Sequence, residues 1–161
     1  MAPVVNMSGT GGPSTYSKQV LAVEMFYRGR DSALAGALLH QNVGQSYMAL
    51  YLLCQAVELV GKSLLILHDY DSFKPTLRAL GHDLVAILWA CETEFKLAPF
   101  TPAFWREIAA LNAFYVQNLR YASIADTFID PRSIESKRTK RKLLAALKVA
   151  RHHLPKSFLR P

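Results

Sequence analysis

The stretch from Gln45 to His68 is apolar on nearly every side when it is wound as a helix. A helix of that kind is normally central in a bundle, because only neighbours on all sides can cover it. Its length would also suit a membrane span, but Glu58 and Lys62 stand within it, and charges near the middle of a span are expensive in lipid. We therefore predict a buried core helix that other helices surround, and no membrane partner.

Apolar residues at helical spacing predict further helices on both sides of this core helix, and no alternation typical of strands is visible. These helices are expected at about Ser17–Tyr27, Ala33–His40, Gly81–Phe95, Pro102–Ala122 and Ser133–His153. Arg28–Ser32 is predicted to break the first helical stretch, and Tyr70–Thr76 is predicted to be a loop. The sequence therefore predicts an all-α, antiparallel bundle of four to five helices.

The length of 161 residues suits one domain with a hydrophobic core. We predict that residues 1–15 are a disordered or vector-derived lead and that residues 16–161 form a single helical-bundle domain with a basic last helix. Cys54 and Cys91 lie among apolar residues outside any CxxC motif, which favours buried, reduced thiols. The first 13 residues lack a basic start and an apolar run, so a cytoplasmic location is expected.

The net charge of +7 is concentrated at the end of the chain. Residues 132–161 hold ten Lys or Arg and one acid, whereas residues 1–131 hold nine basic and eleven acidic side chains. Lys137, Lys140 or Arg141, Lys148 and Arg151 recur at near-helical spacing, and Arg138 stands among them as a further candidate contact. Such a stripe is typical of surfaces that bind phosphate backbones such as RNA. A solvated face, or one that meets an acidic protein partner, is the alternative.

Two polar groups stand out on the predicted helices. Glu58 and Lys62 are four residues apart in the favourable order for a helical ion pair, so they form either a structural pair or a pair that faces a ligand or partner. Gly81-His82-Asp83 has the composition of a helix start, in which Asp83 or His82 caps the helix. His82 as a proton donor or a ligand contact is the sharper alternative.

Arg120 and Tyr121 close the predicted fourth helix. Arg120 either complements the helix dipole or holds a phosphate or carboxylate, and Tyr121 is placed to stack on a base. His152 and His153 are neighbours that diverge by about 100° on a helix, so they make no shared metal site. Motifs of nucleotide, zinc and hydrolase sites are absent from the sequence. We therefore predict no catalytic residue, no metal site and no cofactor.

Four motifs follow one another in the middle of the chain. They are Ser46-Tyr47, Ala56-x-Glu58-x-x-x-Lys62-x-Leu64, Gly81-His82-Asp83-Leu84-x-x-x-Leu88 and Tyr115-x-x-x-x-Arg120-Tyr121. Together with an Ala/Leu helix at Leu143–His153, this order from Gln45 to Leu154 resembles the HEPN domain family. The resemblance implies a bundle of four to five helices that often dimerises.

Many HEPN proteins are ribonucleases, often toxin components, in which four to six residues separate an Arg from a His. No Arg and His of this sequence have that spacing. Arg78 and His82 come closest to it, with three residues between them. Arg120-Tyr121 is similar to the non-nuclease branch of the family, although Ala122 stands where that branch usually has Pro. Members of that branch are thought to bind nucleotides or polyanions, or to serve as interaction modules.

We therefore predict a non-catalytic binding and dimerisation module for a nucleotide or other polyanion, with a homodimer as its expected assembly. Its ligand cleft is predicted to be bordered by Arg120, Tyr121, Lys62, Glu58 and His82. One alternative is a HEPN-type ribonuclease with a displaced site that pairs Arg120 with His152 or His153. The other alternative is a structural partner in a two-protein system.

Overall fold

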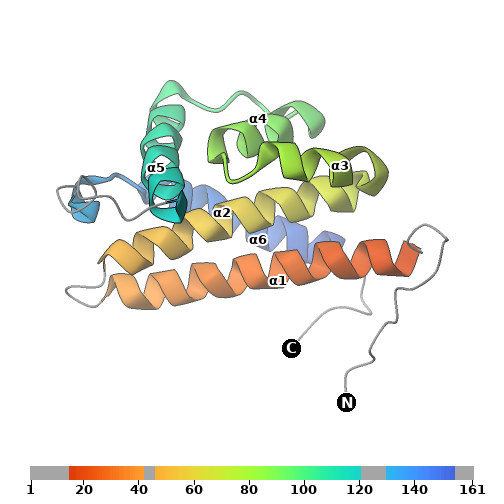
Figure 1. The fold of residues 1–161 in the computed structure, drawn as a ribbon, viewed down its shortest axis with the longest axis horizontal. Coiled ribbons are helices and arrows are strands. Elements are labelled where there is room, and N and C mark those ends of the chain that lie inside the picture. The colour runs from red at the N-terminus through yellow and green to blue at the C-terminus, as the bar shows by residue number, and fades with distance from the viewer. Residues whose placement is uncertain (1–14, 42–45, 121–129, 155–161) are drawn as a thin grey trace, which may run out of the picture.

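The computed structural model describes residues 15–41, 46–120 and 130–154, and most of these residues are helical (Figure 1). The helices are α1 (Thr15–His40), α2 (Ser46–His68), α3 (Tyr70–Leu80), α4 (Leu84–Glu94), α5 (Pro102–Arg120), the short 3-10 turn η2 (Pro131–Ser133) and α6 (Lys137–His153). No strand occurs within these three ranges. The predicted all-α helical bundle is confirmed.

The helices are arranged around α2 (Figure 1). α1 and α2 form a long antiparallel pair, and α6 lies behind α2 in this view. Leu154, which directly follows α6, is buried against Phe26 and Tyr27 of α1. α3 and α4 lie over the second half of α2, while α5 stands steeply across its first half. Most of the bundle therefore packs against one helix.

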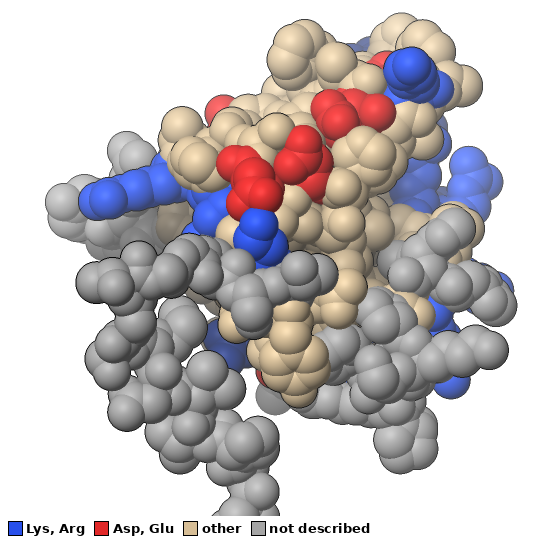
Figure 2. Space-filling model, turned by 90° about the vertical axis from the view of Figure 1, so that its right-hand side faces the viewer, with Lys and Arg blue, Asp and Glu red and all other residues tan. Residues whose placement is uncertain are grey.

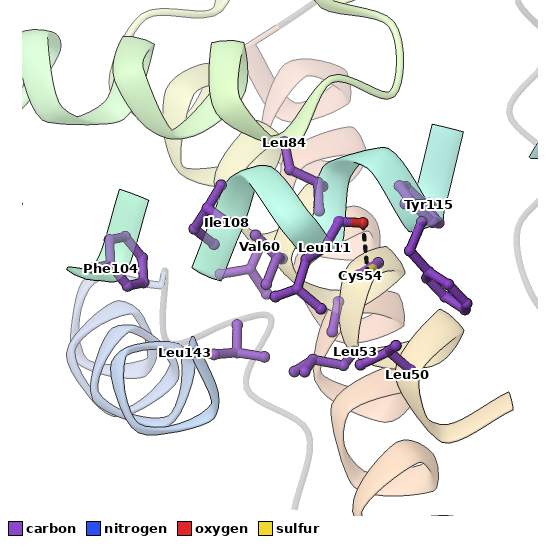
Figure 3. Packing of buried hydrophobic residues seen from close by; sticks show 13 residues of the cluster. Leu50, Leu53, Cys54, Val60, Leu84, Phe104, Ile108, Leu111, Tyr115 and Leu143 are labelled. Carbon is purple, nitrogen blue, oxygen red and sulfur yellow. Dashed lines mark hydrogen bonds between the residues drawn. The ribbon is translucent and has the colours of Figure 1, made fainter. Parts of the chain in front are cut away.

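The core is built on α2. Its apolar side chains pack against those of α4, α5 and α6 (Figure 3). Cys54 lies among them, fully buried, and its thiol donates to the carbonyl oxygen of Leu111 at 3.7 Å. By length and composition alone α2 is apolar enough to cross a membrane, but 67% of its most apolar window is buried inside the bundle. The predicted core helix is confirmed.

The predicted break at Arg28–Ser32 is wrong, because α1 continues through it without interruption. Gly29 has a packing role there instead of a turn role. A Cβ added at Gly29 would lie 2.8 Å from Val60 Cγ2 on α2, so glycine is what lets the two helices approach. Asp31, which belongs to the predicted break, lies inside the helix, where its carboxylate pairs with Arg30 at 2.9 Å.

The predicted loop at Tyr70–Thr76 is also wrong, because these residues belong to α3. Asp69 caps this helix: its carboxylate accepts hydrogen bonds from the backbone N–H of Ser72 at 3.1 Å and from the Ser72 hydroxyl at 2.6 Å. The cap supports the first turn, and Pro75 is accommodated within the helix. α3 ends at Gly81, whose φ of 53° lies in the left-handed region that glycine adopts at little cost.

The remaining boundaries differ by a few residues. Asp83 is the N-cap of α4, as one interpretation of the sequence expected, and accepts from the N–H groups of Val85 and Ala86 at 2.9 and 3.1 Å. The last helix begins at Lys137 and not at Ser133, because Pro131–Ser133 form a separate 3-10 turn. Residues 1–14 of the expected lead lie outside the described residues, and Thr15 already belongs to α1.

Candidate functional site

Glu58 lies at the centre of a buried polar cluster. Its carboxylate accepts hydrogen bonds from Lys62 Nζ at 2.7 Å and from the Tyr115 hydroxyl at 2.8 Å. His82 Nδ1 lies 3.0 Å from the same carboxylate. Lys62 also donates to the backbone carbonyl of Gly81. We call Glu58, Lys62, His82 and Tyr115 the Glu58 cluster.

The members of the Glu58 cluster come from three parts of the fold. Glu58 and Lys62 stand one turn apart on α2, His82 belongs to the turn between α3 and α4, and Tyr115 comes from α5. The structure thus brings together three of the five side chains predicted to border a cleft. Tyr115 was not among them, although its spacing of four residues from Leu111 places it on the core-facing side of α5.

The charges of the cluster follow from its surroundings. Burial by itself would raise the pKa of Glu58, but hydrogen bonds from Lys62, His82 and Tyr115 outweigh burial and bring the pKa below its ordinary value of 4.5. Burial raises the pKa of Tyr115 far above its ordinary value, and the neighbouring Glu58 carboxylate adds to the effect. Near neutral pH the cluster therefore holds a carboxylate that accepts from a neutral phenol.

Three members of the Glu58 cluster have little contact with solvent: Glu58 is 5%, Lys62 8% and Tyr115 2% exposed. A ligand cannot reach Glu58 or Lys62 without displacing their present partners. The arrangement is that of a structural pair which ties α2 to the α3–α4 turn and to α5. The ligand-facing alternative for this pair stays a prediction.

His82 is the one member of the cluster that solvent reaches, with 58% of its side chain exposed. Its ring meets that of Tyr115 edge-on, with centroids 6.2 Å apart. The carboxylate fixes Nδ1, while Nε2 makes no hydrogen bond to any residue in the described ranges. A carboxylate that orients an imidazole leaves the other nitrogen available for proton transfer or ligand contact.

The other two predicted cleft residues are not placed beside this cluster. Arg120 is the last residue of α5, and its side chain lies outside the part that the structure describes, as does all of Tyr121. The side chains of His152 and His153 are likewise outside it. The predicted cleft and the displaced ribonuclease site therefore both stay predictions.

The basic helix α6 has its cations on two different sides. Lys137, Arg141, Lys148 and Arg151 are exposed and form no ion pair with the described residues. Arg138 instead pairs with Glu135 at 3.0 Å and with Glu107 at 3.5 Å. Lys140 is half-buried, and burial lowers its pKa.

Glu107 on α5 anchors the start of α6 and was missed by the sequence analysis. Its carboxylate accepts from the backbone N–H groups of Thr139 at 2.6 Å and Arg138 at 3.3 Å. These are among the N–H groups that a helix leaves without an internal partner. Burial would raise the pKa of Glu107, but the hydrogen bonds from α6 lower it. The available signal was a lone acid spaced three residues from Phe104 and four from Leu111, on the apolar side of α5.

Metal and thiol chemistry find no support in the described residues. No group of three or more His, Cys, Asp or Glu within them is placed to hold a metal ion. Cys54 and Cys91 are both free and buried, and burial raises the pKa of each to about 12. Neither thiol is therefore a ready nucleophile, because the thiolate is the reactive form.

No family model, no curated protein and no solved structure matches this chain. The HEPN resemblance thus rests on the motifs of the sequence alone. What the fold adds is an all-α bundle that agrees with the architecture the resemblance implies.

Proposed function

We propose that the chain is a non-catalytic binding module that holds a polyanion such as RNA along the outer face of α6. The observation that carries this proposal is the set of four exposed cations on one side of that helix. We call Lys137, Arg141, Lys148 and Arg151 the α6 stripe. The same proposal includes the family resemblance, a homodimer and a nucleotide site beside Arg120. None of these three is supported by a contact between described residues.

The members of the α6 stripe lie on one side of the helix. They follow one another at intervals of four, seven and three residues, which keeps them on one side of the helix and spreads them over about 21 Å. The opposite side of α6 is occupied, because Leu143 is buried in the core. Since the stripe has no acidic partner among the described residues, its charge is available to a ligand.

The expected binding is electrostatic and tolerant of base sequence. Phosphate contacts made by Lys and Arg release counterions and carry no base information. Many proteins that bind single-stranded nucleic acids stack aromatic side chains on the bases. The helix α6 contains no Phe, Tyr or Trp. The buried members Glu58, Lys62 and Tyr115 take no part, because they are already paired with one another.

The test compares two triple variants of equal charge in binding to a labelled single-stranded RNA. Lys137→Gln/Arg141→Gln/Lys148→Gln removes three cations of the α6 stripe, and Lys74→Gln/Arg78→Gln/Arg106→Gln removes three exposed cations elsewhere. Fluorescence anisotropy is recorded over a range of salt concentrations. We expect the stripe variant to bind at least about tenfold more weakly. The slope of log K against the logarithm of the salt concentration should become less steep by about 0.7 for each phosphate that is no longer neutralised.

The control variant is expected to bind RNA like the unaltered chain. Equal losses in the two variants would mean that net charge alone attracts the RNA, and would reject the α6 stripe as the site. RNA cleavage that Arg120→Ala abolishes would reject the non-catalytic proposal. If an acidic protein binds through the α6 stripe and RNA does not, the proposal that the ligand is RNA is wrong.

A further inference from the structure

A large, mostly apolar cavity lies beside α2. Its volume is about 870 Å³, within the range of small-molecule sites in proteins. α2 lines its base, α4 and α6 line its sides, and the starts of α1 and α5 reach its two ends. It contains no member of the Glu58 cluster and no member of the α6 stripe.

The cavity exists because α4 and α6 both pack against α2 without packing extensively against one another. Ala146 on α6 is a small residue of the lining. Gly61 on α2 also lines the cavity, and it lets α4 approach α2, because a Cβ there would lie 2.6 Å from Ile87 Cγ2. Most of its lining is apolar and includes larger side chains such as Leu64, Phe95 and Leu143. The lining along α2 from Val57 to His68 extends over about 16 Å. The cavity therefore has the shape and polarity for one extended apolar chain.

Its two ends differ in charge. At the end beside α5, Lys142 Nζ lies 4.6 Å from the ring centroid of Phe100 and 5.2 Å from that of Phe104, and it has no carboxylate partner among the described residues. At the other end Lys18 pairs with Asp71 at 2.6 Å. Figure 2 views the molecule from this second end, where acidic side chains gather near the middle of the face. Among the residues that the structure describes, the Lys142 end thus offers an uncompensated cation beside an apolar space, and the Lys18 end does not.

We propose that this cavity binds a single-chain fatty-acid anion, with its acyl chain along α2 and its carboxylate on Lys142. The apolar lining removes the chain from water, which is the main source of affinity for such a ligand. The exposed cation at one end fixes the direction of the chain, because a carboxylate binds more strongly beside a charged donor than beside an apolar wall. Nucleotides and RNA do not suit this cavity, because its lining has few polar groups.

The test is isothermal titration of the full chain with dodecanoate below its micelle concentration, with dodecanol and decanoate as comparison ligands. We expect one dodecanoate per chain. Lys142→Gln should weaken dodecanoate about tenfold and leave dodecanol unchanged, because only the acid uses the cation. Lys74→Gln removes an exposed cation outside the cavity and should change neither. Shortening the ligand by two methylenes should weaken binding about tenfold or more.

Ala146→Phe fills the cavity from the α6 side and should abolish binding of both dodecanoate and dodecanol. Thermal unfolding followed by circular dichroism shows whether each variant is folded, and Lys142→Gln alone tests the headgroup if Ala146→Phe is not. Uptake of several equivalents, or equal weakening by Lys142→Gln and Lys74→Gln, would overturn the proposal. So would a chain that is dimeric in solution and binds no dodecanoate, since a second copy would then cover the cavity. RNA binding through the α6 stripe is independent of each of these outcomes.

Discussion

The Tyr115 hydroxyl donates a hydrogen bond of 2.8 Å to Glu58, a residue 57 positions earlier in the chain. The bond joins α5 to the centre of α2, at a point where both side chains are buried. Lys62 and His82 share the same carboxylate, so one acid connects three parts of the fold. The stability of the bundle should therefore respond strongly to changes at this point.

Tyr115→Phe is expected to destabilise the fold by about 1–3 kcal/mol, because it removes a hydrogen bond to a buried charged group and leaves the ring in place. Chemical unfolding monitored by circular dichroism measures the free energy of unfolding. Tyr51→Phe is the matched control: the Tyr51 ring packs against that of Tyr115 at 5.5 Å, and its hydroxyl has no described hydrogen-bond partner. Equal losses in the two variants would contradict a special role for the Tyr115 hydroxyl.

Glu58→Gln is expected to cost about 3–5 kcal/mol, since it leaves the buried ammonium of Lys62 without its anion. Lys62→Met should also be costly, because the carboxylate then loses its main counter-charge. The double variant should cost less than the sum of the two single changes, since neither uncompensated charge remains. Unfolding free energies of all four proteins in one double-mutant cycle give the coupling. Additive losses would show that the two groups are stabilised separately.

Acidification should weaken the attachment of α6 to α5. The pKa of Glu107 is lower in the fold than its ordinary value of 4.5. A carboxyl with a lowered folded pKa contributes stability that is present above its unfolded pKa and is lost as pH falls through its folded pKa. The unfolding free energy should thus fall as pH drops below about 4.5. In the Glu107→Gln variant the unfolding free energy should fall less steeply over that interval. Glu135→Gln, at an exposed acid, should follow the unaltered protein.

The fold class could be predicted from the sequence because the strongest signal, the apolar length of α2, is also the element on which the bundle is built. The cap at Asp83 could be predicted because capping is local. The helix α3 could not be, because Asp69 stabilises its first turn although Pro75 stands within it. Within that segment one residue favours a helix and another disfavours it, and the sequence alone does not show which effect is larger.

The Glu58 cluster could be predicted only in part, for a different reason. The ion pair of Glu58 with Lys62 lies within one helix, so its spacing is visible in the sequence. The contact with Tyr115 depends on how α5 crosses α2, which no local pattern specifies. Glu107 illustrates the same limit: an acid on an apolar side signals a buried partner, but not that the partner is the start of α6.

Gly61→Ala tests whether Gly61 lowers the stability of α2 or allows α4 to pack closely. From the sequence alone, a glycine within a helix indicates only a lower helix propensity. A Cβ added at Gly61 would lie 2.6 Å from Ile87 Cγ2, so we expect overpacking of about 1–3 kcal/mol, partly offset by about 1 kcal/mol of helix propensity. Ile87→Leu removes the β-branch methyl, so the glycine substitution should cost less in that background. Thermal and urea unfolding of the four proteins measure this coupling. A stabilised Gly61→Ala variant would mean that α4 moves away from α2 at little cost.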